Sequence, residues 1–509
     1  MSLSKDILRL AGPSILANIT VPLVGMVDLA VAGHIGAGGS AGAGLALGGA
    51  SAATLISGIA VGTMLFDLLY WNFSFLRAGT AGLTAQAYGR WRSARIHPSP
   101  DNPYAGGGEI AGILQRALRI AVLSGLILIA LQWAVVWLAF RVVDCSPEVQ
   151  VLATRYFYIR IWAAPATLSL FAFKGWFIGL QDTVRPMLAD LIVNGVNIVL
   201  SILLALGIPG VFPGMGFVGI ALGTVTAQFA GFTYCVLAAR RRYAPLLPHP
   251  LFALLPPKSF FLMRLHDSTP VPTPDKDAAN ASGAESYAPV ETARYWVGDT
   301  DLVLRSMGMI AVYIGFTLIS ARYGDMMLAV SAILMKLLLF FSYFTDGFAY
   351  AGEALTGRFI GEGSIPGVRA TVRVTFAWSA AVVGLFFLAY GLGGTMLLRL
   401  MSADPAVVQA GQPFLPWLLL MPLIGCPAFV WDGIFIGATA TKSLRNSTLL
   451  CAMGFFAAWF AGKWFAGGGN IAPETAIHIL LGAYFVHLAI RAAYLTFRYR
   501  PAVLKHQDR

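Results

Sequence analysis

The sequence predicts an all-α integral membrane protein with twelve transmembrane helices, arranged as two pseudo-symmetric six-helix lobes around a central cleft. Three observations support this prediction. Of the 509 residues, 57% are hydrophobic and only 12% are charged, with a mean hydropathy of +0.72. Soluble proteins carry about 25% charged residues, so this chain cannot cover a water-facing surface. Long apolar runs favour helices over barrel strands, and one polar segment divides these runs into six and six.

The candidate spans follow from the thickness of the bilayer. A hydrocarbon core of about 30 Å requires ~20 apolar residues per helix. The spans predicted in this way cover residues 10–34, 50–77, 112–140, 155–179, 187–208, 217–239, 301–321, 326–349, 370–392, 412–437, 446–465 and 475–497. Most of the connections are short and are marked by glycine, proline or charge.

One connection differs in length and composition. Residues 243–298 contain nine prolines, many small polar residues and mixed charges. This composition predicts a largely flexible cytosolic linker between an N-terminal lobe, residues 1–242, and a C-terminal lobe, residues 299–509.

Two short matches relate the halves of the chain to each other. Gly175–Gly179 resembles Gly433–Gly437, and Ala81–Gly89 resembles Glu353–Gly361. Both matches fall at equivalent positions of a six-plus-six arrangement. They therefore indicate a parallel repeat, which is typical of secondary transporters.

The net charge of +11 lies in short loops between apolar runs, without a basic arm carrying interleaved aromatics, so no nucleic-acid partner is predicted. If the chain starts inside, 28 of its 35 Lys and Arg residues lie at inner loops and helix ends. The positive-inside rule then predicts a multi-pass protein of the inner cell membrane with both termini in the cytoplasm. The remaining seven are Arg141, Arg155, Arg160, Arg322, Lys336, Arg399 and Lys463.

Asp28 is the leading functional candidate, because an ionised group at the bilayer centre costs ~2.5–3.5 kcal/mol and usually faces a cavity or a partner. It lies in the outer half of the first span. Pro22 removes a backbone donor and Gly25 loosens packing, so a bend is predicted just before the carboxylate. A titratable group on a bendable helix indicates a proton switch. The alternative is a carboxylate hydrogen-bonded only for structure.

The fifth span carries a polar stripe. Asp190, Asn194, Asn197 and Ser201 are spaced by four, three and four residues, which places them on one helical face. This pattern favours a lining for a substrate cavity. Hydrogen bonds between helices are an alternative for the asparagines, and plain solvation is an alternative for Asp190.

Three further groups are candidates. Asp67 shares a helix face with Trp71 and is either a second coupling carboxylate or a buried neutral hydrogen-bonding group. Lys336 stands alone among apolar residues and either extends to the outer surface or faces the cleft as a counter-charge. The third group is an acidic stripe at the inner end of the eighth span, which Arg305 or Arg358 would neutralise as an inner gate. Its members are Asp346, Tyr350 and Glu353.

The chain lacks signatures of enzymes and of bound cofactors. It has no Walker lysine and no HExxH motif, and His478 and His487 fall on opposite faces of one helix. The four cysteines are scattered and predict neither a disulfide framework nor a metal site. We therefore expect no enzyme activity, no metal and no cofactor other than a coupling ion.

Several segments resemble the DinF-like branch of the multidrug and toxic compound extrusion (MATE) transporters. They are Leu10–Gly36, Phe75–Gly89, Gly179–Pro186, Asp346–Leu355 and Asp432–Ala438. The resemblance implies two six-helix lobes around a cleft, alternating access, and efflux of organic, often cationic or amphipathic compounds in exchange for H⁺ or Na⁺.

The resemblance also assigns roles to residues. It places the family's first-helix carboxylate on Asp28, its bend-forming proline on Pro22 and its fifth-helix asparagine on Asn197. Ser201 stands where related sequences often have an aspartate, which leaves Asp67 or Asp190 as the second carboxylate. Lys336 stands where a neutral amide is expected, and a positive charge facing the cleft would favour anionic or zwitterionic cargo.

The predicted function is therefore secondary active efflux of small organic substrates, by a monomer in the lipid bilayer, in exchange for protons or Na⁺. One alternative is a flippase for lipids or polysaccharide precursors from the same superfamily. A second alternative is a membrane sensor or scaffold that does not transport and docks through residues 243–298.

Overall fold

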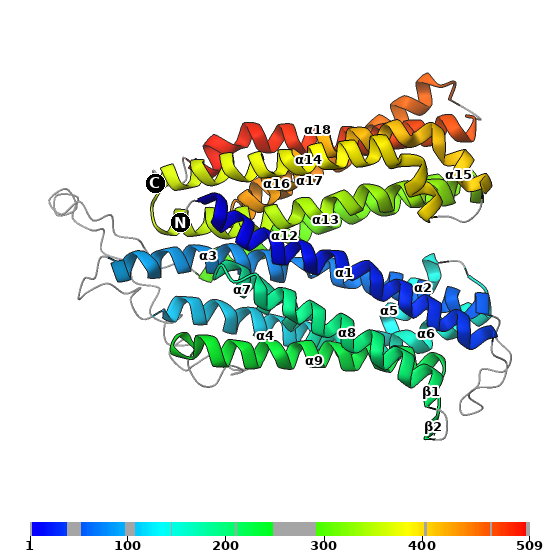
Figure 1. Ribbon diagram of the computed structural model, residues 1–509, viewed down its shortest axis with the longest axis horizontal. Coiled ribbons are helices and arrows are strands. Elements are labelled where there is room, and N and C mark those ends of the chain that lie inside the picture. The colour runs from blue at the N-terminus through cyan, green and yellow to red at the C-terminus, as the bar shows by residue number, and fades with distance from the viewer. Residues whose placement is uncertain are drawn as a thin grey trace.

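The computed structural model describes residues 3–37, 52–96, 107–143, 145–208, 211–247, 292–401, 405–468 and 471–504. Long helices lie side by side in two groups, which we call the N lobe (up to Leu247) and the C lobe (from Thr292) (Figure 1). The prediction of an all-α membrane fold is confirmed. Most of the predicted linker, 243–298, lies outside the described residues, and the first helix of the C lobe begins at Thr292.

The N lobe is built from nine helices and a two-residue antiparallel strand pair among the described residues. The helices are α1 (Leu3–Ala37), α2 (Ala52–Asn72), α3 (Ser74–Ile96), α4 (Gly108–Ala130), α5 (Gln132–Val142), α6 (Pro147–Arg160), α7 (Ala164–Gly179), α8 (Val184–Leu206) and α9 (Phe217–Tyr243). The strands β1 (Gly207–Ile208) and β2 (Phe212–Pro213) close the turn between α8 and α9.

The C lobe follows the same plan with fewer interruptions. Its described helices are α12 (Thr292–Ala321), α13 (Asp325–Gly361), α14 (Ile365–Met401), α15 (Pro405–Gly411), α16 (Leu415–Gly437), α17 (Thr441–Phe465) and α18 (Pro473–Tyr499). Eleven spans of the described chain are long and apolar enough to cross a membrane, and α1 is a further helix of 35 residues.

Several helices are longer than the predicted spans. The predicted span 326–349 corresponds to α13, which has 37 residues and continues to Gly361. At 1.5 Å per residue this helix is about 55 Å long, well beyond the ~30 Å hydrocarbon core. The predicted span ends before Glu353 and Arg358, because these charged residues lower the hydropathy of the sequence. The helix continues because both side chains find partners in the N lobe, Arg77 and Gln181.

Equivalent helices of the two lobes break at equivalent points. A single 3₁₀ turn, Ile161–Ala163, separates α6 from α7, and Gln412–Phe414 separates α15 from α16. In each case a proline follows at the start of the next helix, Pro165 or Pro416, where its missing N–H costs no hydrogen bond. The sequence predicts each of the spans 155–179 and 412–437 as a single helix, because periodicity does not reveal a one-turn change of pitch.

The internal repeat appears in how helices approach each other. Side chains added at Gly175 or Gly179 of α7 would meet the backbone of α3, and side chains added at Gly433 or Gly437 of α16 would meet the backbone of α13. The turn after each pair is also shared. Gln181 and Thr439 both adopt positive φ, and the amide of the residue after each donates to a carbonyl five residues earlier.

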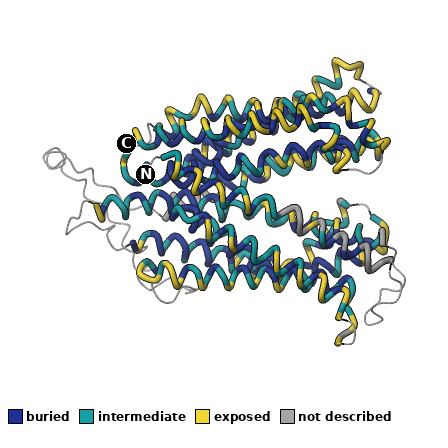
Figure 2. Tube along the Cα trace, in the orientation of Figure 1, coloured by how far each residue is buried: buried dark blue, intermediate teal, exposed yellow. Residues whose placement is uncertain are grey.

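The two lobes meet at the end of the bundle where Leu3, Leu247 and Leu504 lie, which we call the terminal end (Figure 1). Buried residues concentrate there (Figure 2). An apolar cluster joins the lobes through α1, α3, α7 and α13, and the helices diverge toward the opposite end. The cluster contains Ile7, Leu10, Ala11, Ala81, Ile178, Phe348, Ala351, Ala354 and Leu355.

Polar contacts reinforce this junction. The Asn18 amide donates to the Tyr343 carbonyl at 3.2 Å, and the Gln86 amide donates to the Gly437 carbonyl at 3.1 Å. The terminal end is therefore closed by contacts between α1 and α3 on one side and α13 and α16 on the other.

Candidate functional site

Asp28 lies inside the N lobe, where α1 packs against α8. Its residue is only 6% exposed, and its Oδ1 accepts no hydrogen bond from the described residues. The Ser201 side chain of α8 lies beside the carboxylate. Burial of a carboxylate is costly unless a donor or a cation satisfies it, so this position is suited to take up a proton or a cation.

Two polar atoms of α8 near Asp28 also lack a hydrogen-bond partner among the described residues. Asn197 is buried, and its amide Nδ2 donates to the Thr224 hydroxyl of α9 at 2.9 Å. The Asn197 Oδ1 and the Ser201 Oγ have no partner among the described residues. The helix pair α8–α9 packs closely here, since a Cβ at Gly223 would lie 2.8 Å from Ser201 Oγ. Asp28, Asn197 and Ser201 therefore form a buried group of oxygens, which we call the Asp28 site.

The residues of the predicted polar stripe on α8 contact different neighbouring helices. The Asn194 amide donates to the Thr20 hydroxyl of α1 at 2.7 Å, and so it faces the same helix as the Asp28 site. Asp190 instead forms an ion pair with Lys174 of α7. The two asparagines link α8 to α1 and to α9, whereas Asp190 belongs to a separate contact.

Pro22 and Gly25 lie on α1, shortly before Asp28 in the sequence. The backbone of α1 continues as one helix through both positions. The side chain of Pro22 lies outside the described residues, and an added Cβ at Gly25 would meet nothing within 4 Å. The predicted role of this segment as a bend stays a prediction.

Arg160, at the end of α6, connects Asp28 to a second carboxylate. It interacts electrostatically with both Asp28 and Asp67. Its guanidinium lies 4.8 Å from the centre of the Phe66 ring, and it donates to the Tyr156 hydroxyl at 3.2 Å. Sequence reasoning counted Arg160 only as one of seven outer basic residues, so its role in the site was missed.

Asp67 faces the other lobe. Its side chain is exposed on α2 and interacts electrostatically with Lys336 of α13 as well as with Arg160. Lys336 is also exposed, so the structure places it toward an N-lobe aspartate. One turn beyond Asp67, the Trp71 ring is 37% exposed and forms an edge contact with Tyr313 of α12, at 5.5 Å between centroids. Opposite charges and aromatic rings thus face each other between the lobes.

The acidic stripe of α13 joins a buried network of charges. Glu353 is fully buried and accepts a hydrogen bond from Arg77 of α3 at 3.3 Å, so this ion pair crosses between the lobes. The predicted partner, Arg305, instead binds Asp432 of α16 at 2.5 Å. The predicted neutralisation of the stripe by Arg305 or Arg358 stays a prediction: Arg305 interacts electrostatically with Glu353 and Asp346, while the direct partner of Glu353 is Arg77 of α3.

Asp346 completes this network without a direct bond. It interacts electrostatically with Arg77, Arg305 and Arg491. Arg491 of α18 is buried and pairs with Asp432. Three arginines therefore balance three carboxylates. Arg77, Asp432 and Arg491 were not predicted as site residues, and their only signal was a charge within an otherwise apolar run.

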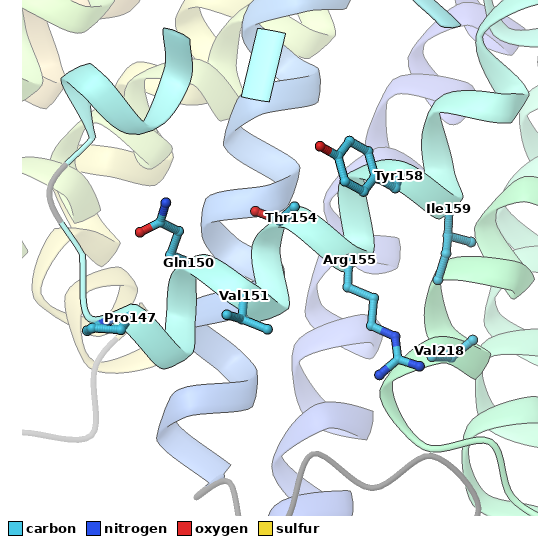
Figure 3. A pocket seen from close by; sticks show the side chains of 8 residues that line it. All are labelled: Pro147, Gln150, Val151, Thr154, Arg155, Tyr158, Ile159 and Val218. Atoms are coloured by element: carbon cyan, nitrogen blue, oxygen red, sulfur yellow. The ribbon is translucent and has the colours of Figure 1, made fainter. Parts of the chain in front are cut away.

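A separate cavity of about 750 Å³ lies along one face of α6 (Figure 3). Thr154, Arg155 and Tyr158 line it, with Val218 at the start of α9. None of the predicted site residues lines this cavity, so it is separate from the Asp28 site. No group of three or more His, Cys, Asp or Glu side chains in the described part of the chain is arranged to hold a metal ion.

Two repeated helical lobes, with a sheltered carboxylate in the first, define a membrane transporter. Comparisons with known proteins give the family. A family model described as MatE matches residues 108–203 and 302–458. The DNA damage-inducible protein F of Escherichia coli (strain K12) is 30% identical over 488 residues, covering 96% of this chain and 92% of that protein. The chain belongs to the MATE family of transporters and is not an enzyme.

More distant relatives agree with this assignment. Protein DETOXIFICATION 45, chloroplastic, of Arabidopsis thaliana is 23% identical over 441 residues, covering 86% of this chain and 69% of that protein. The crystal structure of the Vibrio cholerae MATE transporter VcmN in the bent form has a TM-score of 0.72 at 14% identity, covering 100% of this chain and 98% of that one. The predicted DinF-like fold is thereby confirmed.

Proposed function

We propose that the protein is an efflux antiporter of the inner cell membrane that exports small organic compounds in exchange for protons or Na⁺. The observation that carries this proposal is the Asp28 site. It gathers buried oxygens of Asp28, Asn197 and Ser201, and the Ser201 side chain lies beside the Asp28 carboxylate. A proton on Asp28 would supply one donor, and a bound Na⁺ would be coordinated by the same oxygens.

Arg160 couples the charge of the Asp28 site to the charge of Asp67 at the surface between the lobes. When Asp28 is charged, the guanidinium is attracted both to it and to Asp67. Protonation of Asp28 removes one of these attractions, so Arg160 shifts toward Asp67. The charge offered to a cargo molecule then changes without any contact between the cargo and Asp28. Coupling of this kind requires only that the two ligands favour different states.

The contacts between the lobes at one end of the bundle support transport by alternating access. The terminal end is closed by the cluster around Leu10 and Leu355 and by the Arg77–Glu353 pair. We place the cargo chamber between the diverging halves of the lobes, next to Asp67, Trp71 and Lys336. The closed terminal end faces the cytoplasm under the predicted orientation, so this state would release cargo outward.

The substitution Asp28→Asn tests the coupling. It keeps the size of the side chain but removes the exchangeable proton and the charge. We expect proton-driven export in everted vesicles to be lost while the variant inserts and unfolds at the wild-type temperature. Glu474→Gln, at an exposed position of α18, is the matched control and should export normally. Unimpaired export by Asp28→Asn, with the wild-type dependence on the pH gradient, would refute the proposal.

Separate variation of the two ion gradients identifies the coupling ion. Vesicles with a pH gradient but no sodium gradient should support export if protons are exchanged. The reverse condition should support export if Na⁺ is exchanged. Export under neither gradient, in protein that binds cargo, would contradict antiport by either ion.

The charges between the lobes favour zwitterionic cargo. Asp67 and Lys336 present opposite charges across the two lobes, and Trp71 and Tyr313 present aromatic surface beside them. An amphipathic molecule with both charges would match this arrangement. Lys336→Gln removes the positive partner, so transport should shift toward cationic dyes. A competition series with cationic, zwitterionic and anionic dyes measures this shift, and an unchanged preference would place Lys336 outside the cargo site.

A further inference from the structure

A second cavity lies at the terminal end, at the junction of the two lobes. Its volume is about 770 Å³. It is lined by the start of α1, the end of α3, the turn before α8, the end of α9 and, from the C lobe, α13. We call it the arginine pocket because six arginines and only two aspartates, Asp6 and Asp182, line it. The arginines are Arg9, Arg92, Arg95, Arg185, Arg242 and Arg358.

The positive charge of the arginine pocket is only partly balanced. Asp182 pairs with Arg185 at 2.9 Å, and Glu362, beside the pocket, serves both Arg92 and Arg358. Arg9 and Arg242 form no ion pair with the described residues. They are exposed rather than withdrawn into the protein. Two guanidinium groups are therefore available to an anion.

The pocket also offers neutral donors that no protein acceptor uses. Thr183 stands at the N-terminus of the 23-residue helix α8, is 2% exposed, and its hydroxyl has no partner among the described residues. The buried amide Nε2 of Gln181 is likewise without an acceptor there. The start of α8 adds the positive end of a helix dipole. Guanidinium groups, a hydroxyl and a helix N-terminus together are the donor set of a phosphate site.

The pocket also contains the aromatic residue types that are typical of the lipid headgroup level. The Tyr88 and Trp91 rings line the pocket and stack on each other at 5.7 Å, and the Arg95 guanidinium lies 5.0 Å above the Trp91 ring. Trp and Tyr side chains collect at the membrane–water interface. Basic pockets between helices at this depth recognise anionic headgroups.

We propose that the arginine pocket binds a phosphate group, supplied by an anionic phospholipid headgroup or by a soluble phosphate compound, and that this ligand stabilises the closed terminal end. Arg9 and Arg242 of the N lobe and Arg358 of the C lobe line the same cavity, so one phosphate group draws the lobes together. The site is independent of the proposed ion coupling, because no residue of the Asp28 site takes part.

The test compares two double variants of the full-length purified protein. Arg9→Gln/Arg242→Gln removes the two unpaired charges of the pocket. Arg240→Gln/Arg241→Gln is the matched control, since both arginines are exposed at the same end of α9 and neither lines the pocket. Binding is measured with phosphatidylglycerol in detergent micelles and, separately, with inorganic phosphate. We expect the pocket variant to bind at least about tenfold more weakly and the control to bind normally.

The two ligands identify the source of the phosphate. Binding of phosphatidylglycerol alone assigns the pocket to a lipid, whereas binding of inorganic phosphate as well assigns it to phosphate groups in general. Spin labels on the terminal ends of α3 and α13 should report a narrower distribution of distances between the lobes when ligand is present. Binding of neither ligand, equal loss in both double variants, or a distance distribution that ligand leaves unchanged would overturn the proposal.

Discussion

At the scale of single residues, Arg160 is the side chain on which coupling in the N lobe most depends. It is the cation that Asp28 and Asp67 share, and its guanidinium contacts the Phe66 ring and the Tyr156 hydroxyl. Removal of a cation beside a buried carboxylate leaves that carboxylate uncompensated, which typically costs 3–5 kcal/mol. A change at Arg160 should therefore alter the response of the Asp28 site to protons rather than the fold of the lobe alone.

We expect Arg160→Gln to reduce proton-driven export about tenfold or more, because Asp28 would no longer be held charged next to a cation. Arg160→Lys keeps the positive charge but loses the planar contact with Phe66, so it should restore part of the activity. Export rates in everted vesicles at several external pH values measure both effects. Equal rates and equal pH profiles for the two variants would show that the charge of Arg160 has no part in coupling.

Sequence reasoning found Asp28 because a lone carboxylate in an apolar run is visible without any structure. Arg77 and Arg160 were missed for a physical reason. Both lie near the ends of apolar runs, where a basic residue is ordinarily explained by orientation in the membrane. The partner of Glu353 lies 276 positions earlier in the chain. Only the packing of one lobe on the other determines such a pair, and helical periodicity carries no information about it.

At the scale of helices, glycines determine how closely neighbouring helices approach. A side chain at Gly437 of α16 would meet the carbonyl of Glu353 on α13, and the same relation holds between Gly179 of α7 and Ala81 of α3. Small residues at such crossings are the usual means by which membrane helices pack closely. The equivalence of these crossings explains why the Gly175–Gly179 and Gly433–Gly437 segments match in sequence.

We expect Gly437→Ala to lower the thermal stability of the protein, because its Cβ would collide with backbone rather than with a flexible side chain. Overpacking of this kind typically costs 1–3 kcal/mol. Gly384→Ala on α14 is the matched control, since an added Cβ there meets nothing within 4 Å. The control should be neutral or slightly stabilising, because alanine favours helix by about 1 kcal/mol over glycine. Thermal unfolding in detergent compares the two, and similar stabilities would argue against the close crossing.

The helices themselves were largely predictable, because the bilayer requires spans of a certain length and composition. What apolar length alone did not predict is where a span breaks or continues. The 3₁₀ turns before Pro165 and Pro416 fall inside runs whose overall hydropathy does not change at the break. The extension of α13 to Gly361 depends on Arg77 and Gln181, which lie on other helices. Breaks and extensions therefore reflect tertiary packing that single-sequence periodicity does not report.

At the scale of the whole molecule, the junction between the lobes must open and close without either lobe unfolding. Its apolar cluster is small compared with the cores inside each lobe, and ion pairs and hydrogen bonds supply the rest of the contact. A small and partly polar interface between two bodies allows them to move relative to each other, whereas a large apolar interface would stay closed. The junction thus has the composition expected of a reversible gate.

The contact between Ser74 of α3 and Ser306 of α12 allows an experiment on this gate. Their hydroxyl oxygens lie 3.1 Å apart across the two lobes. Cysteines at both positions would meet the geometric needs of a disulfide with little backbone movement. Three of the native cysteines are buried, so Cys145→Ser gives a suitable background for the experiment. Oxidation of Ser74→Cys/Ser306→Cys should then hold the lobes together at this point.

If transport requires the lobes to separate here, oxidation of the double variant should abolish export and a reductant should restore it. Each single cysteine variant should be insensitive to the same oxidant, which excludes an effect of oxidation elsewhere. Gel mobility after cleavage within 248–291 measures the cross-link, since only a disulfide would keep the two lobes in one band. Full export by completely cross-linked protein would mean that the lobes move about a different axis, with Ser74 and Ser306 at its hinge rather than at its gate.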